Sequence, residues 1–212
     1  MFILGMLFGS TAGITLQAQG IIEGRVKLPP PSTNPANAAR YKIKASGPVA
    51  VPEPPKAVVY LEGNVVNSTN KPGTVRVGQK GFQFEQGLLP IQKGTVVEFP
   101  NFDDDYHNVF SYSKVKRFDL GRYKKDEKPA SQKFDRPGVV KLYCEIHEHM
   151  RSTILVLDTP YFQKTDAEGK FHLGNIPAGH YKLKAWLDED KVLEQDVEVK
   201  ESQITQANFE TK

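Results

Sequence analysis

The stretch Gly138-Val-Val-Lys-Leu-Tyr-Cys144-Glu-Ile-His147-Glu-His149-Met150 carries the only cysteine of this chain and two of its five histidines. Its first half alternates apolar and polar residues, which is typical of a half-buried β-strand. Its second half brings a cysteine, a histidine and the only methionine beyond residue 6 into one short segment. The stretch therefore predicts a strand that ends in a loop rich in soft metal ligands.

These ligand types favour copper. A thiolate, an imidazole and a thioether together suit copper, whereas a thioether adds little to a zinc site. A trigonal copper site with a weak axial methionine needs a second histidine. We predict that His107 supplies it, because His107 begins a strand candidate directly after the acidic loop 101–106. His149 is left open as a further ligand and is expected to be a solvated surface residue.

The rest of the chain predicts an all-β protein, because short alternating segments recur between glycines and prolines. We expect an exposed loop at 122–131, which is rich in lysine. Strands are expected at 22–28, 41–45, 57–61, 74–77, 82–84, 95–99, 107–111, 138–144, 152–157, 170–173, 181–187, 192–199 and 204–209, with a turn at 174–179.

Composition excludes several classes of protein. The chain has 212 residues, of which 39% are hydrophobic and 25% charged, as in ordinary globular domains. Its formal charge of +3 is too small to indicate a nucleic-acid partner. A single cysteine excludes an internal disulfide framework, Cys-x-x-Cys motifs and cysteine-held iron–sulfur clusters.

The N-terminus favours export. Residues 1–18 read as an apolar core followed by small and polar residues, although no Lys or Arg precedes the core. Leu16-Gln17-Ala18 is an acceptable cleavage triplet, so we predict a secretory signal peptide and a periplasmic or otherwise extracytoplasmic protein. No spanning segment is expected in the mature chain, because no run reaches the ~18 apolar residues of a spanning helix. A free thiol is a liability in an oxidising compartment, so we expect this cysteine to have a function of its own.

The ligand pattern resembles the cupredoxins, in particular plastocyanin and amicyanin. The resemblance covers about 72–158 and rests on His107-Asn108 followed by Cys144-x-x-His147-x-x-Met150. It implies a Greek-key β-sandwich that holds one type 1 copper. His107, Cys144 and His147 would be its equatorial ligands and Met150 its axial ligand.

The same resemblance implies further roles. Asn108 would tie the two ligand loops together by hydrogen bonds, and His147 with Ile146 would form the electron-transfer surface. The implied function is one-electron transfer between redox protein donors and acceptors, and not an enzymatic reaction. One departure is Glu148, where many relatives have proline. Multicopper oxidases need several His-x-His pairs, and His147-Glu-His149 is the only such pair here.

The flanking segments resemble a different family. The pattern from Thr165 to Leu183 is similar to carboxypeptidase regulatory-like, or transthyretin-like, β-sandwiches, whose usual opening segments occur here at 24–26 and 57–63. We therefore predict a smaller discontinuous sandwich from 20–70 and 159–212, with the copper domain of 72–158 inserted in it. The alternative arrangement appends the pieces in sequence. The alternative function is a non-redox binding or adhesion module with a structural or copper-storage domain.

Overall fold

A computed structural model describes residues 19–30, 55–63, 71–128 and 130–210. All regular secondary structure in these ranges consists of β-strands. The all-β prediction is therefore confirmed for the described residues. The predicted signal peptide at 1–18 and the predicted strand at 41–45 lie outside them. No membrane-crossing helix occurs in the part of the chain that the structure describes.

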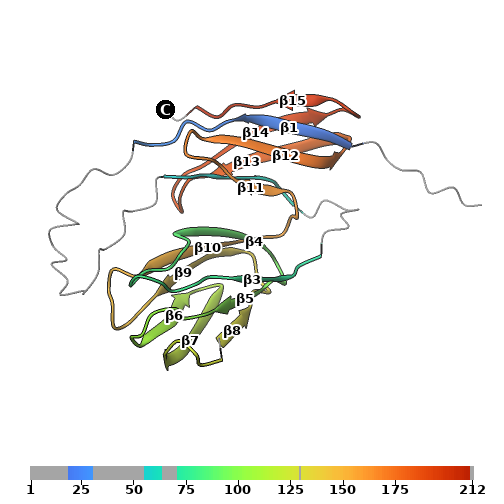
Figure 1. The fold of residues 1–212 in the computed structure, drawn as a ribbon. Coiled ribbons are helices and arrows are strands. Elements are labelled where there is room, and N and C mark those ends of the chain that lie inside the picture. The colour runs from blue at the N-terminus through green and yellow to red at the C-terminus, as the bar shows by residue number, and fades with distance from the viewer. Residues whose placement is uncertain (1–18, 31–54, 64–70, 129, 211–212) are drawn as a thin grey trace, which may run out of the picture.

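Two of the four sheets form a sandwich that we call the terminal sandwich, because strands from both ends of the described chain build it (Figure 1). One sheet has the order β12 (Lys170–Pro177), β1 (Gln19–Arg25), β15 (Ile204–Gln206). The other has the order β11 (Phe162–Lys164), β2 (Val58–Leu61), β13 (Gly179–Trp186), β14 (Val192–Val199).

The other two sheets form the central sandwich, whose strands all lie between residues 74 and 157. Its larger sheet has the order β4 (Leu88–Gln92), β10 (Arg151–Leu157), β9 (Gly138–Tyr143), β6 (His107–Ser113), β7 (Lys116–Tyr123). Its smaller sheet has the order β3 (Thr74–Arg76), β5 (Val96–Phe99), β8 (Ala130–Lys133).

In the terminal sandwich, strands from the N-terminal part of the chain pair with strands from its C-terminal part. β1 pairs antiparallel with β12 and parallel with β15, and β2 pairs antiparallel with β11 and β13. Gly24 permits the close approach of β1 to the last strand segment, because a Cβ there would lie 1.6 Å from the carbonyl oxygen of Ala207. Each sheet of the terminal sandwich therefore combines one strand that precedes the central sandwich in the sequence with strands that follow it.

The two sandwiches are joined by a third apolar layer. In β10, Ile154 and Val156 face the core of the central sandwich, while Leu155 and Leu157 contact Val58 and Trp186 of the terminal sandwich. Because successive side chains of a strand point to opposite faces, a strand buried on both faces must be apolar throughout. This burial on both faces explains the uninterrupted apolar run from Ile154 to Leu157. In Figure 1, β10 and β4 lie on the side of the central sandwich that faces the terminal sandwich.

Several predicted boundaries are wrong. Residues 82–84 form a turn with one isolated bridge, because Gly81 and Phe82 both have left-handed backbone angles. The predicted loop 122–131 contains the end of β7 and the start of β8, whose charged side chains lie at sheet edges. The predicted turn 174–179 is mostly strand, since β12 continues to Pro177.

Candidate metal centre

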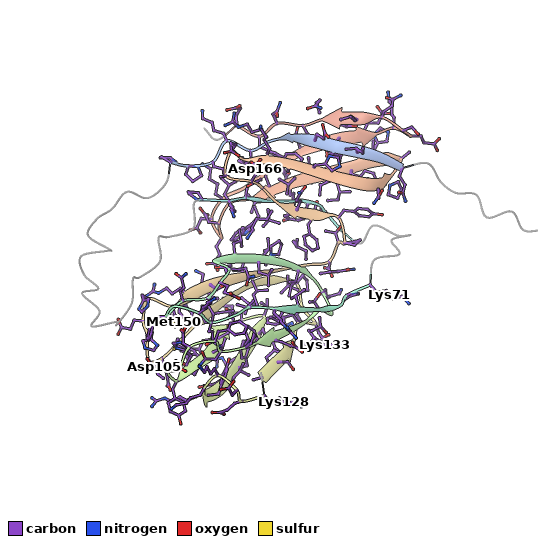
Figure 2. All side chains as sticks on the ribbon, in the orientation of Figure 1. Lys71, Asp105, Lys128, Lys133, Met150 and Asp166 are labelled. Atoms are coloured by element: carbon purple, nitrogen blue, oxygen red, sulfur yellow. The ribbon has the colours of Figure 1, made fainter. Side chains whose placement is uncertain are left out.

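Cys144, His147 and Met150 lie in the loop between β9 and β10. Cys144 follows the last residue of β9 and is 3% exposed, and Met150 is wholly buried in the same apolar cluster. The N–H of Met150 donates to the carbonyl of His147 over 2.9 Å, which closes the loop into a tight turn. Figure 2 places Met150 and Asp105 at the same end of the central sandwich.

His107 reaches this loop because its strand is adjacent to β9. β6 and β9 run antiparallel, with Phe110 opposite Tyr143, so the first residues of β6 lie beside the residues that follow β9. Asn108 fixes this contact: its Oδ1 accepts the N–H of Glu145 over 2.7 Å. Asn108 thus links the two ligand segments by a hydrogen bond, in the position where the sequence predicts that role.

Three of the predicted ligand atoms converge. The donor atoms of His107, Cys144 and His147 all lie within 4.8 Å of one another. The Nδ1 atoms of the two histidines are 3.1 Å apart, and Sγ of Cys144 is 3.9 Å from Nδ1 of His147. A thiolate and two imidazoles in this arrangement are the donor set of a trigonal copper site. It is the only such group of His, Cys, Asp or Glu side chains found among the described residues.

The surroundings favour the thiolate. Burial opposes ionisation of Cys144, but hydrogen bonds from His107 and from the backbone N–H groups of Asn108, Ile146 and His147 outweigh it and lower the pKa of the thiol. A cysteine binds metal as thiolate, so the lowered pKa reduces the free energy needed to deprotonate it when a metal binds.

The two histidines differ in their electrostatics. Burial lowers the pKa of His107, but hydrogen bonds with Cys144 and Asp103 raise it by more, so the net shift is upward. The pKa of His147 is lowered, first by burial and then by the charges of His107 and His149. The lowered pKa keeps His147 neutral, which is the state in which an imidazole binds metal.

Sequence reasoning missed Asp103. Its Oδ2 lies 2.9 Å from Nε2 of His107, on the side of the ring opposite the converging Nδ1 atoms. The same carboxylate accepts the N–H groups of Gly81 and Phe82 at 2.8 and 3.0 Å. The signal in the sequence was a carboxylate four residues before a candidate ligand, since ligand histidines commonly donate their second N–H to a carboxylate.

Phe82 was also missed as a site residue. Its ring lies edge-on to His147 and His107, with centroid distances of 5.1 and 5.8 Å. Gly81 and Phe82 form a two-residue turn with φ of 64° and 59°, closed by the N–H of Lys80 donating to Gln83 over 2.9 Å. Such a turn needs positive φ at both positions, which costs a phenylalanine about 1–2 kcal/mol. A hydrogen bond to a charged group contributes about 1.5–3 kcal/mol, so Asp103 offsets this cost.

The remaining predicted residues are placed as follows. Ile146 is 39% exposed beside the partly exposed His147, at the surface of the loop. The ring of His149 lies 6.0 Å from that of His147 and outside the convergent group. His172, on β12 of the terminal sandwich, pairs through Nδ1 with Glu23 at 2.8 Å.

Comparisons with known proteins give partial likenesses to copper proteins. A Cu(I) form of an amicyanin mutant is 24% identical over 40% of this chain and 82% of its own, with a TM-score of 0.37. A copper-containing nitrite reductase from Thermus scotoductus is 25% identical over 43% of this chain and 24% of its own, with a TM-score of 0.38. A purple cupredoxin from Nitrosopumilus maritimus is 20% identical over 40% of this chain and 98% of its own, with a TM-score of 0.35. No protein-family profile and no curated protein matches the chain.

Proposed function

We propose that this chain is an exported type 1 copper protein that carries single electrons between redox proteins. The observation that carries the proposal is the convergence of Cys144, His107 and His147, with donor atoms within 4.8 Å of one another. Soft sulfur with two imidazoles suits both oxidation states of copper, so little ligand movement accompanies electron transfer. When bound, copper supplies a one-electron couple, reduced by a donor protein and reoxidised by an acceptor, with no proton transferred and no covalent bond changed.

The residues fit one copper per chain. The Sγ of Cys144 and the Nδ1 atoms of His107 and His147 would hold it, and the thioether of Met150 would be a further donor. Met150 is wholly buried in the apolar cluster that also contains Cys144, so its sulfur is shielded from solvent. The hydrogen bond from the N–H of Glu145 to Oδ1 of Asn108 holds the two ligand segments together, which limits rearrangement of the site.

The proposed route for electrons passes through His147. Its side chain is partly exposed, and Ile146 beside it is 39% exposed, whereas His107 and Met150 are fully buried. A partner that docks on this loop would therefore reach the site most closely through the imidazole of His147. We propose an electron carrier and not an enzyme, because the chain has a single His-x-His pair and no ligand set for a second copper is evident in its sequence.

The proposed domain division is 72–158 for copper, with 20–70 and 159–212 as one discontinuous sandwich. The pairing of β1 with β12 and β15, and of β2 with β11 and β13, supports it. The likeness of the terminal sandwich to carboxypeptidase regulatory-like domains remains a prediction from sequence. Its proposed role is to hold the copper domain or to contact a partner.

The test is a titration of the metal-free protein with Cu(II), followed by visible and EPR spectra. We expect one equivalent to produce an intense thiolate-to-copper band with narrow copper hyperfine splitting, absent in Cys144→Ser. His172→Ala is the matched control, because it removes an imidazole from the terminal sandwich and should leave the spectrum unchanged. A weak, ordinary Cu(II) spectrum that persists in Cys144→Ser would overturn the proposal. Binding without reversible one-electron reduction would favour the copper-storage alternative.

A further inference from the structure

We propose that Asp103 is a positioning residue that sets the orientation of His107, closes the Phe82 turn over the site and lowers the reduction potential of the bound copper. This inference rests on the proposed function. It concerns the one carboxylate that contacts a predicted ligand directly among the described residues.

The carboxylate of Asp103 is the centre of three hydrogen bonds. Its Oδ1 accepts the N–H of Gly81 at 2.8 Å, and its Oδ2 lies 3.0 Å from the N–H of Phe82 and 2.9 Å from Nε2 of His107. The residue itself is held in place, because the backbone N–H of Asp103 donates to Oδ1 of Asn101 over 2.9 Å. Asn101 in turn donates to the backbone carbonyls of Asp105 and Tyr123. Asp103 therefore has a fixed place between the loop 101–106 and the turn at 81–82.

The contact with His107 decides which ring nitrogen faces the metal. An ionised carboxylate only accepts hydrogen bonds, so Nε2 of His107 carries a proton, and in the neutral form of the ring Nδ1 then keeps its lone pair. Nδ1 is the atom that lies 3.1 Å from Nδ1 of His147. His107 is fully buried, so water does not compete for Nε2. The contact with Asp103 thus selects, for the neutral imidazole, the tautomer whose free nitrogen faces the site.

The same carboxylate places a negative charge next to the ligand shell. A fixed anion stabilises the doubly charged Cu(II) more than the singly charged Cu(I), because the interaction scales with the charge of the ion. A lower reduction potential follows. The side chain of Asp103 is only 15% exposed, so solvent screens this effect less than it screens a surface charge.

The contacts with the turn extend the effect to the cover of the site. Phe82 adopts its left-handed backbone angle while its N–H donates to Asp103, and its ring then lies edge-on to both histidines. Removing the carboxylate removes the acceptor that offsets this unfavourable conformation. Asp103 therefore both orients His107 and holds the ring of Phe82 next to the two histidines.

The test compares Asp103→Asn with Asp104→Asn, which removes the same charge from an exposed position of the same loop. In Asp103→Asn we expect the affinity for Cu(II) to fall about 10–100-fold and that for Cu(I) to fall less. Each tenfold difference between the two raises the potential by about 59 mV. In Asp104→Asn we expect both affinities to stay within about threefold, since exposed charges are screened. Equal potentials in Asp103→Asn and wild type, with the type 1 spectrum retained, would overturn the inference.

A measurement on metal-free wild type separates this inference from the proposed function. Nitrogen-15 NMR in alkaline solution, where imidazoles are neutral, should place the proton of His107 on Nε2, and the amide of Phe82 should exchange slowly. A proton on Nδ1, or fast exchange at Phe82, would overturn the inference whether or not Asp103→Asn folds. Failure of wild type to form a type 1 site, with the proton on Nε2, would overturn the proposed function and leave the positioning role of Asp103 supported.

Discussion

Replacing Leu155 by alanine should destabilise the whole molecule by removing one side of the contact between its two sandwiches. Leu155 is 5% exposed and points out of the central sandwich onto Val58 and Trp186 of the terminal one. The substitution deletes three carbons, and burial of each contributes about 0.8 kcal/mol, or about 2.4 kcal/mol together. The cavity left between two rigid sheets adds to this, so we expect about 2.5–4 kcal/mol.

The assay uses the single tryptophan of the chain. Trp186 is 8% exposed and lies in the same apolar layer, so its fluorescence reports on this contact, while far-UV circular dichroism reports on all strands. We expect both transitions of Leu155→Ala to move together to lower denaturant. Ile204→Ala is the control, because Ile204 is 56% exposed and its truncation should cost about 1 kcal/mol or less. A cost below about 1 kcal/mol for Leu155→Ala, or an unchanged fluorescence transition, would refute the reasoning.

Two further predictions concern stability. Tyr123→Phe should cost about 1–3 kcal/mol, because the hydroxyl donates to the carbonyl of Phe99 and accepts from Gln79 Nε2, both at 2.7 Å. Burial raises the pKa of Tyr123 above its ordinary 10.0, so wild type should lose stability as pH rises above 10, where only the unfolded chain is deprotonated, and Tyr123→Phe should lose less. Gly24→Ala should cost about 1–3 kcal/mol or more, because its Cβ would lie 1.6 Å from the carbonyl oxygen of Ala207.

Denaturant unfolding at several pH values checks both variants. For Tyr123→Phe, stability equal to wild type below pH 10 would mean that the buried hydrogen bonds contribute nothing net. For Gly24→Ala, amide exchange in β15 should accelerate more than in β6, because the added methyl group meets Ala207 and Phe171, both in the terminal sandwich. Uniform acceleration across both sandwiches would contradict a local clash.

Sequence reasoning worked where one strand face or one short segment contained the signal. The alternation in β9 and the uninterrupted apolar run of β10 correspond to their burial on one or two faces. The sequence predicts all three residues whose donor atoms converge, because Cys144 and His147 lie in one short segment and His107 begins a neighbouring strand.

It failed where edge strands and separate loops decide the structure. β7 carries alternating charged residues at the edge of its sheet, and their composition resembles that of a loop. β4 contains Pro90, which an edge strand tolerates because it pairs on one side only. The contact of Asp103 with the turn at Phe82 joins residues that no local pattern connects, so only the fold brings them together.

The position of β1 between β12 and β15 has a consequence for the order of folding. The first strand of the described chain completes its sheet only with strands made after the whole central sandwich. Contacts between residues close in sequence form sooner than contacts across the full chain, because a shorter loop must be closed. We therefore expect the central sandwich to fold first. Until β12 and β15 are in place, the backbone N–H and C=O groups of β1 have no strand partner. We expect the proposed copper ligands, all of which lie between residues 107 and 150, to be assembled before the terminal sandwich forms.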